Sequence, residues 1–282
     1  PEHCENPLCP GRSRSWFGRR RQPRGLWLNE QWYCGTACLR QGAERFLRRF
    51  DLTSARHRPL RYRQPIGLLM HSRGLITDEK LKAAIQAQKE AGSGRLGEWL
   101  IRLGATTEEQ VTATLSLQWG CPIFPIEQKP HFLEWSFMVP FPILKAARMI
   151  VAHGQPANNT YYLAFADGID HTVIRSFEAM YECDGKPCVA QESAFNGALG
   201  QLEATGLPPT TIANCEYHPL PVSEIIQQAA DALDAETLRL VSCAGFHWLR
   251  LQHAEAVQHL LIPVPVPENE MEEHEVNEAL IG

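Results

Sequence analysis

The sequence predicts an α+β protein built from several small domains, and three observations support that class. Four of the nine cysteines lie within the first 38 residues, residues 65–118 contain an internal repeat, and strand-like and helix-like apolar patterns alternate over most of the remainder. The 282 residues are enough for two or three compact units. We expect, in order, a small cysteine-rich finger, a four-helix tandem-repeat unit, a small α/β unit and a C-terminal α+β unit.

Charge is distributed unevenly between the head of the chain and the rest. Residues 1–63 hold 14 arginines, no lysine and five acidic residues, a net charge of +9, whereas the remainder holds 13 basic and 27 acidic residues, a net charge of −14. A basic head suggests contact with phosphate or an acidic partner, although a solvated arginine-rich surface explains the same composition. No apolar run reaches the roughly 18 residues of a membrane span and no signal peptide is evident, so we expect a cytoplasmic protein without membrane insertion.

The four early cysteines have the spacing of a metal site. They form two close pairs separated by 24 residues: Cys4, Cys9, Cys34 and Cys38. Two such pairs supply the four soft, tetrahedral ligands that structural zinc prefers, and a reduced compartment favours metal binding over a disulfide framework. Apolar alternation at 26–28 and 31–33 indicates a hairpin, and the spacing after Cys38 indicates a helix. We therefore expect structural Zn²⁺, with four free thiols in a small core as the alternative.

This order of cysteine pair, hairpin, second cysteine pair and helix resembles a treble-clef zinc finger, and WYCGTACL at 32–39 is similar to the second knuckle of such fingers. The resemblance implies a structural metal with no open coordination position. Treble-clef fingers bind nucleic acids or proteins, so both kinds of partner stay open. The arginines that are suited to phosphate contacts are Arg12, Arg14, Arg19, Arg20, Arg21 and Arg24.

The internal repeat consists of two 24-residue halves, 65–88 and 95–118, that align without a gap. Each half predicts two short helices, because apolar residues recur at helical spacing on both sides of a glycine. Thr77 in the first half, and Thr106 or Thr107 in the second, are suited to cap the helix that follows. We therefore expect a compact four-helix unit with pseudo-twofold character.

The repeated pattern resembles the N-terminal domain of type II secretion and type IV pilus assembly ATPases, in one branch of which a tandem 24-residue motif binds cyclic di-GMP. Arginine can pair with phosphate or guanine, and glycine lets the backbone approach a ligand. Pro65 stands where the first motif should have arginine. A family fold that has lost the ligand is therefore the alternative to binding. The ligand residues that the resemblance implies are Arg95, Leu96, Gly97, Leu100, Gly104, Leu115, Gln118, Ile66, Gly67, Gly74, Ile85 and Gln88.

Residues 119–204 predict an α/β unit. The patterns indicate a proline-started helix at 138–147, strands at 148–152 and 161–165, a helix at 171–181, a short strand at 188–190 and a helix from 192. This order, including AFAD at 164–167, resembles the second part of the same secretion-ATPase domain. Asp167 and Asp170 are expected to end the strand and cap the helix, and residues 184–187 are expected to form a turn between Cys183 and Cys188.

The remaining boundaries follow from composition. The expected organisation is a zinc finger at 1–50, a linker at 51–64, the helical repeat at 65–118, the α/β part at 119–204, a proline-containing linker at 205–221, an α+β unit at 222–267 and a glutamate-rich disordered tail at 268–282. The α+β unit is expected to hold an amphipathic helix at 223–233, a hairpin from 238–241 and 247–251, and a strand at 257–266.

The sequence favours a non-enzymatic function. It has no P-loop, because its one Gly-Lys pair is followed by Pro187, and no H-E-x-x-H, G-x-S-x-G or glycine-rich dinucleotide turn. The leading hypothesis is a bacterial regulatory or adaptor protein that combines a zinc finger with a secretion-ATPase-like domain. Its implied partners are cyclic di-GMP and a protein of secretion or pilus machinery. The alternative is a nucleic-acid-binding regulator that uses the arginine-rich finger.

Overall fold

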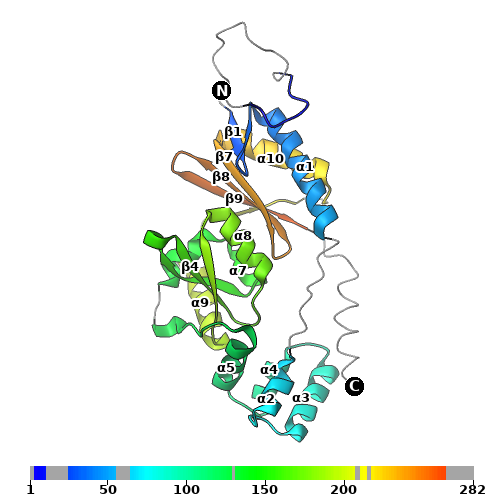
Figure 1. The fold of residues 1–282 in the computed structure, drawn as a ribbon, viewed down its shortest axis with the longest axis vertical. Helices are drawn as coiled ribbons and strands as arrows, with labels where there is room; N and C mark the ends of the chain where they lie inside the picture. The colour runs from blue at the N-terminus through cyan, green and yellow to red at the C-terminus, as the bar shows by residue number, and fades with distance from the viewer. Residues whose placement is uncertain are drawn as a thin grey trace. The chain divides into compact units, whose positions relative to one another are not determined.

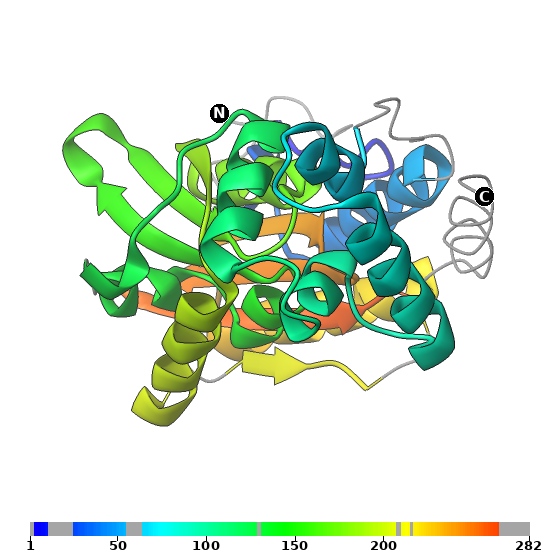
Figure 2. The same ribbon diagram turned by 90° about the horizontal axis from the view of Figure 1, so that it is seen from below.

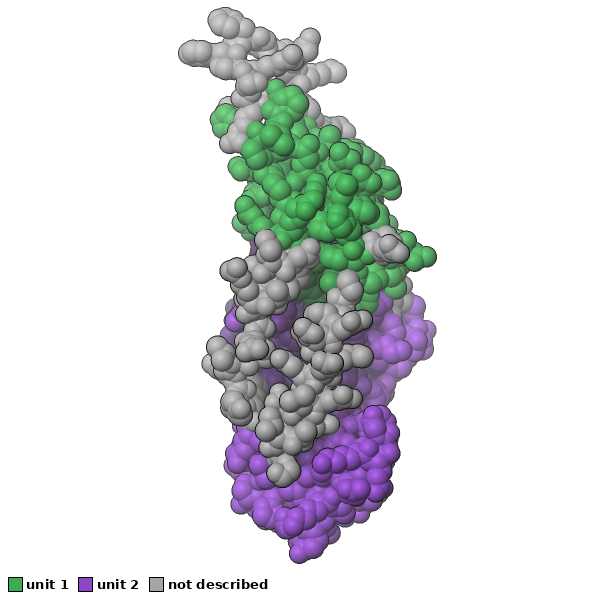
Figure 3. Space-filling model, turned by 90° about the vertical axis from the view of Figure 1, so that its right-hand side faces the viewer, with its two compact units in different colours: residues 1–58, 209–282 green, residues 59–208 purple. Residues whose placement is uncertain are grey.

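The computed structural model describes residues 3–10, 25–54, 64–128, 131–206, 210–214 and 217–264. It divides the chain into two compact units, which Figure 3 colours separately. Unit 1 combines residues 1–58 with residues 209–282, and unit 2 comprises residues 59–208. Both units contain helices and strands, which confirms the α+β class. The expected tail at 268–282 lies outside the described residues.

Unit 1 is built on a six-stranded sheet that draws strands from both ends of the chain. Its strand order is β2-β1-β7-β8-β9-β6. The hairpins β1–β2, β7–β8 and β8–β9 are antiparallel, whereas β1 runs parallel to β7 and β6 parallel to β9 (Figure 1). The strands are β1 (Leu26–Leu28), β2 (Gln31–Tyr33), β6 (Thr210–Ile212), β7 (Thr237–Cys243), β8 (Phe246–His253) and β9 (Ala256–Pro263).

The turn of the first hairpin fastens the head of the chain to β7. Asn29 has a positive φ of 46°, as a two-residue hairpin turn requires, and its side-chain amide makes two hydrogen bonds to Leu240. The amide nitrogen donates to the Leu240 carbonyl at 2.9 Å, and the amide oxygen accepts from the Leu240 N–H at 2.8 Å. The sequence predicted separate units at 1–50 and 222–267. In the structure these two segments form one unit, because their strands belong to the same sheet.

Two helices cover one face of this sheet. Helices α1 (Thr36–Ser54) and α10 (Pro219–Leu233) pack against each other, and Leu39, Leu47 and Ile226 join Leu240 and Leu249 in one fully buried core. The expected linkers are shorter than the sequence suggested. Helix α1 continues past residue 50, strand β6 lies within 205–221, and α10 starts at Pro219 because prolines suit the first turn of a helix.

The tandem repeat folds as predicted into four helices, which are the cyan and teal ribbons of Figures 1 and 2. The Thr77 hydroxyl caps α3, and Thr107 forms a capping box with Gln110 at the start of α5. Gly74 and Gly104 have φ values of +68° and +63°, which allow the chain to turn between the helices of each half. The helices are α2 (Ile66–Ser72), α3 (Asp78–Ala91), α4 (Leu96–Arg102) and α5 (Glu108–Trp119).

Close packing of the helices in the repeat depends on the first glycine of each half. A Cβ atom on Gly67 would lie 2.7 Å from Leu81 and 2.8 Å from Leu96, and one on Gly97 would lie 3.1 Å from Val111. Gly67 and Gly97 therefore let neighbouring helices approach closely. The core between the helices is formed by Met70, Ile76, Leu81, Ala84, Leu100, Ala105 and Val111.

The rest of unit 2 is a three-stranded sheet with order β3-β4-β5 and helices around it. Strands β3 (Met149–Gln155) and β4 (Thr160–Phe165) are antiparallel, and β5 (Asp184–Val189) runs parallel to β4. The expected turn at 184–187 is wrong, because these residues begin β5, where Pro187 is tolerated near the edge of the sheet. The helices are α6 (Phe132–Trp135), α7 (Phe141–Ala146), α8 (His171–Tyr181), α9 (Glu192–Thr205) and the 3₁₀ turns η1 (Ile126–Gln128), η2 (Ser136–Met138) and η3 (Pro156–Asn158).

Among the described residues, no helix is both long enough and apolar enough to cross a membrane.

Unit 1 also contains a buried histidine with a strongly displaced pKa. His259 of β9 is 6% exposed and its Nδ1 accepts a hydrogen bond from the Trp248 indole at 3.0 Å. Burial, with a smaller contribution from Arg250 on the adjacent strand, lowers the pKa of His259 to about 4. The fold therefore requires the neutral imidazole.

The pKa of His259 predicts an acid-sensitive stability. Below the ordinary histidine pKa of 6.5, His259 is protonated in the unfolded chain but stays neutral in the folded chain. Its contribution to the free energy of unfolding is therefore fully present above pH 6.5 and is lost as the pH falls toward 4. The loss should reach up to about 3 kcal/mol. Denaturant unfolding between pH 7 and pH 4 measures it, and His259→Asn, which keeps an acceptor for Trp248, should flatten the slope. Equal slopes for both proteins would contradict the assignment.

Candidate functional site

The four predicted zinc ligands converge in unit 1. The sulfur atoms of Cys4, Cys9, Cys34 and Cys38 all lie within 4.8 Å of one another. The Cys9–Cys34 and Cys34–Cys38 sulfur distances are 3.5 Å and 3.7 Å. Zinc–sulfur bonds of about 2.3 Å in a tetrahedron place sulfurs about 3.8 Å apart, so these distances suit one zinc ion.

The surroundings of the four thiols support this use. Burial, with contributions from the neighbouring cysteines, raises the pKa of the Cys34 thiol, so four thiolates at this spacing need a bound cation. The Asn6 amide, which is 2% exposed, donates to the Cys38 sulfur at 3.3 Å and to the Gln41 side chain at 2.9 Å. A hydrogen-bond donor of this kind fixes a ligand's orientation around a metal. Sequence reasoning missed Asn6, although its place between the two cysteines of the first pair was a usable signal.

The shared sheet predicts how far the effect of disrupting the four-cysteine cluster extends. Cys34→Ser should lower the zinc content of the purified protein and speed hydrogen exchange in β7 as well as in β1, because the two strands pair directly. Metal analysis and amide exchange by mass spectrometry measure both effects. Cys183→Ser, which changes a cysteine of unit 2, is the matched control and should keep its metal. Exchange that rises in β1 alone would show that the metal supports only the head.

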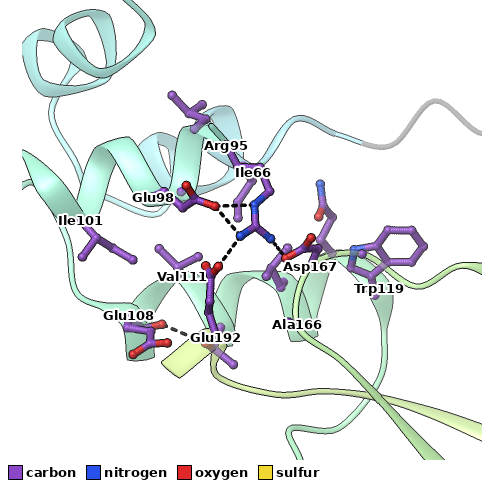
Figure 4. Close-up of a pocket in the computed structure, with 16 residues that line it drawn as sticks. Ile66, Arg95, Glu98, Ile101, Glu108, Val111, Trp119, Ala166, Asp167 and Glu192 are labelled. Carbon is purple, nitrogen blue, oxygen red and sulfur yellow. Dashed lines mark hydrogen bonds and ion pairs between the residues drawn. The ribbon is translucent and has the colours of Figure 1, made fainter. Parts of the chain in front are cut away.

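A pocket of about 260 Å³ lies in unit 2, between the helical repeat and the α/β part. Apolar side chains of α2, α4 and α5 form much of its wall, including Ile66, Leu96, Val111 and Leu115. The remaining wall comes from the end of α5, the segment after β4 and the start of α9 (Figure 4). The charged residues that line it are Arg95, Glu98, Glu108, Asp167 and Glu192.

Arg95 lies at the centre of a charged cluster in this pocket. It occupies the N-cap position of α4, and its side chain reaches the carboxylates of Glu98, Asp167 and Glu192 (Figure 4). Its Nε donates to Glu98 at 2.7 Å, its Nη1 contacts Asp167, and its Nη2 contacts Glu98 and Glu192. Three carboxylates from three segments therefore surround one guanidinium.

A second arginine shares two of these carboxylates. The Nε of Arg148 lies 2.7 Å from Asp167, and its Nη2 lies 2.7 Å from Glu192. Burial and, to a smaller extent, the charge of Arg95 lower the pKa of Arg148. Arg148 has a φ of 46°, which is uncommon for a side chain of this size, and its guanidinium lies 5.3 Å from the centre of the Phe195 ring.

The structure brings six of the twelve predicted ligand residues to the pocket and leaves the other six elsewhere. The six that line it are Ile66, Arg95, Leu96, Gly97, Leu115 and Gln118. Leu100 is fully buried in the repeat core, Ile85 packs against that core, and Gly67 separates two helices. Gly74 and Gly104 form the turns, and Gln88 donates to the Gly94 carbonyl at 3.0 Å.

Sequence reasoning missed most of the acidic residues of the pocket. Asp170 caps α8 as predicted, accepting from Thr172 and Val173. Asp167 was also expected to end a strand and cap a helix, and the structure corrects this, because its carboxylate pairs with Arg95 and Arg148. Glu98 and Glu192 carried no signal of their own. Their positions in the first turns of α4 and α9 suggested only favourable interactions with the helix ends.

Comparison with known proteins finds a relative that matches only part of the chain. No family model matches the sequence. The type IV pilus assembly ATPase PilB of Thermus thermophilus is 24% identical over 144 residues, which is 51% of this chain and 16% of that protein. The chain thus spans less than two thirds of the length of this curated relative.

Comparison with solved structures finds further proteins that match about half of the chain. They include MshE with cdg, at 22% identity and a TM-score of 0.42, which covers 50% of this chain and 99% of that one. The N-terminal domain of XpsE follows at 19% identity and a TM-score of 0.37, covering 48% of this chain and 92% of that one. Over about half its length the chain is similar in sequence to a type IV pilus assembly ATPase.

Proposed function

We propose that the protein is a non-catalytic regulatory or adaptor protein whose unit 2 binds cyclic di-GMP through the second half of its repeat, while zinc held by four cysteines stabilises unit 1. One observation carries the ligand proposal. Arg95 and five other residues of the implied binding motif line a single pocket with an apolar wall. The bacterial secretion or pilus machinery is the proposed protein partner, from the resemblance of the repeat.

The pocket suits one base of a dinucleotide rather than the whole molecule. Sites that enclose a drug-sized ligand measure about 300–1,000 Å³, so a volume of about 260 Å³ holds a base while the remaining ligand lies outside. Guanine offers acceptors at N7 and O6 and a donor at its N2 amino group. The guanidinium of an arginine therefore matches the N7 and O6 acceptors of a guanine edge, and the side chains of Leu96, Val111 and Leu115 offer apolar contact to its faces.

The two halves of the repeat are not equally equipped. Arg95 is the N-cap residue of α4, and the residue at the matching N-cap of α2 is Pro65, which is exposed. Proline offers no cation and no donor for a phosphate or a base. The first half therefore contributes Ile66 to the wall of the pocket but no charge.

The rival function, nucleic-acid binding by the head, has no support from the described residues. Arg12, Arg14, Arg19, Arg20, Arg21 and Arg24 lie outside them. Two described arginines of the head already have acidic partners. Arg48 lies 2.7 Å from Glu44, and Arg40 lies 3.4 Å from Glu224. The non-catalytic assignment rests on the sequence, which has no P-loop.

Loss of the central arginine should weaken ligand binding. Arg95→Ala removes the one arginine that lines the pocket, and a charge-assisted contact of this kind is worth roughly tenfold or more in affinity. Isothermal titration calorimetry with cyclic di-GMP measures the loss. Arg102→Ala, on the same helix with its guanidinium over the Trp99 ring, is the matched control and should bind like the wild type. No heat from the wild type at high micromolar ligand would refute the ligand proposal.

Restoring the missing arginine should strengthen binding. Pro65→Arg places a guanidinium at the N-cap of α2, in the position that Arg95 has in the second half. Because position 65 is exposed, the larger side chain needs no repacking. Affinity measured by the same titration should rise several-fold, whereas Pro65→Ala should not change it. An equal response to both substitutions would show that position 65 takes no part in ligand binding.

A further inference from the structure

The hydrogen-bonding capacity of Arg95 is already committed within the protein. Each of its three guanidinium nitrogens has a carboxylate partner, supplied by Glu98, Asp167 and Glu192. A phosphate or a base edge that takes a bidentate hold on arginine needs two N–H groups on one side of the guanidinium plane. A ligand can therefore bind Arg95 in this way only by displacing a carboxylate.

The carboxylates differ in what their displacement would release. Glu98 lies on α4, three residues from Arg95, so that ion pair stays within one helix. Asp167 follows β4 and Glu192 begins α9, so their ion pairs with Arg95 join the helical repeat to the α/β part. Figure 4 shows these segments converging on the guanidinium. Displacing Asp167 or Glu192 would break a bridge between the two parts of unit 2.

Arg148 lowers the electrostatic cost of separating Arg95 from Asp167 or Glu192. It contacts Asp167 and Glu192 at 2.7 Å each, independently of Arg95. A buried or half-buried carboxylate that loses its only cation is strongly destabilised, but these two keep a partner when Arg95 leaves. The backbone of Arg148, immediately before β3, has a left-handed conformation, and its guanidinium lies over the Phe195 ring. Contacts within the α/β part therefore constrain the position of Arg148.

We propose that Arg95, Asp167 and Glu192 form a clasp between the helical repeat and the α/β part, and that an anionic ligand opens it by taking Arg95. Asp167 and Glu192 thus set the affinity of the pocket by competing with the ligand, and Arg148 holds them in both states. This inference rests on the proposed function for its ligand, but the clasp itself exists without ligand. It couples occupancy of the pocket to the attachment of one part of unit 2 to the other.

Linkage gives the sign of the effect. A ligand that binds only the open state must overcome the free energy of the closed clasp, so any change that weakens the clasp raises the apparent affinity by the same factor. Neutralising one bridging carboxylate also removes a negative charge from the pocket. Both effects act in one direction, and we expect an affinity gain of roughly fivefold or more for an anionic ligand.

The test uses the full-length protein with Asp167→Asn and Glu192→Gln as separate variants. Each single variant leaves Arg148 with one bridging carboxylate, which limits the risk of unfolding. Glu90→Gln on the exposed side of α3 is the matched control for loss of one negative charge. Calorimetry with cyclic di-GMP measures affinity, and amide hydrogen exchange of the ligand-free proteins measures protection in α4 and at the start of α9.

The clasp predicts tighter binding and faster exchange in both bridging variants, with neither change in Glu90→Gln. If wild type and variants bind with equal affinity, or if exchange in α4 and α9 is unchanged, the clasp is overturned while the proposed ligand stands. If no protein binds cyclic di-GMP, the proposed function fails. The clasp is then decided by exchange alone, with faster exchange in the two bridging variants supporting it and unchanged exchange refuting it.

Discussion

The charged cluster around Arg95 is the interaction on which the organisation of unit 2 depends. An arginine at the N-cap of α4 faces the positive end of that helix, where a cation is unfavourable. Its position is tolerated because Glu98 in the same first turn and the carboxylates of Asp167 and Glu192 surround it. Glu108 makes a related contact, accepting from the Ser193 N–H at 2.6 Å, so α5 also meets the start of α9 through a carboxylate. Acidic groups at helix starts thus hold the repeat against the α/β part.

Unit 1 depends on a constraint of a different kind, the pairing of strands from distant parts of the sequence. Strands β1 and β2 are three residues each, and two such strands are not stable alone. They gain stability from β7, from the bidentate hydrogen bonds of Asn29, and from the four cysteines that fix the turns on either side. In this arrangement a metal at the cysteines would stabilise the sheet formed by the C-terminal strands as well as the finger itself.

Local structure was predictable, and long-range pairing was not. The helices of the repeat follow from apolar spacing, the threonine caps and the glycine turns, all of which act within a few residues. The cysteine cluster was predictable because two close cysteine pairs have the spacing that is typical of zinc ligands. The parallel pairing of β1 with β7 was not, because β1 has only three residues and its partner strand lies more than 200 residues away in the sequence. The predicted role of Asp167 was wrong for a similar reason. A carboxylate that follows a strand can cap a helix or form a distant ion pair, and the local sequence does not distinguish the two.

The asymmetry of the repeat matches the contacts that each half makes. Among the described residues, Asp167, Glu192 and Arg148 surround the second half alone, and the two carboxylates compensate the arginine at its helix N-cap. Pro65 occupies the corresponding position of the first half, is exposed, and suits the start of a helix without any partner. A charged residue stands where neighbouring side chains neutralise it, and a neutral helix-starting residue stands where none of the described contacts would. The repeat is therefore symmetric in its backbone and asymmetric in its electrostatics, which makes the second half the place where a charged ligand and the fold compete for the same arginine.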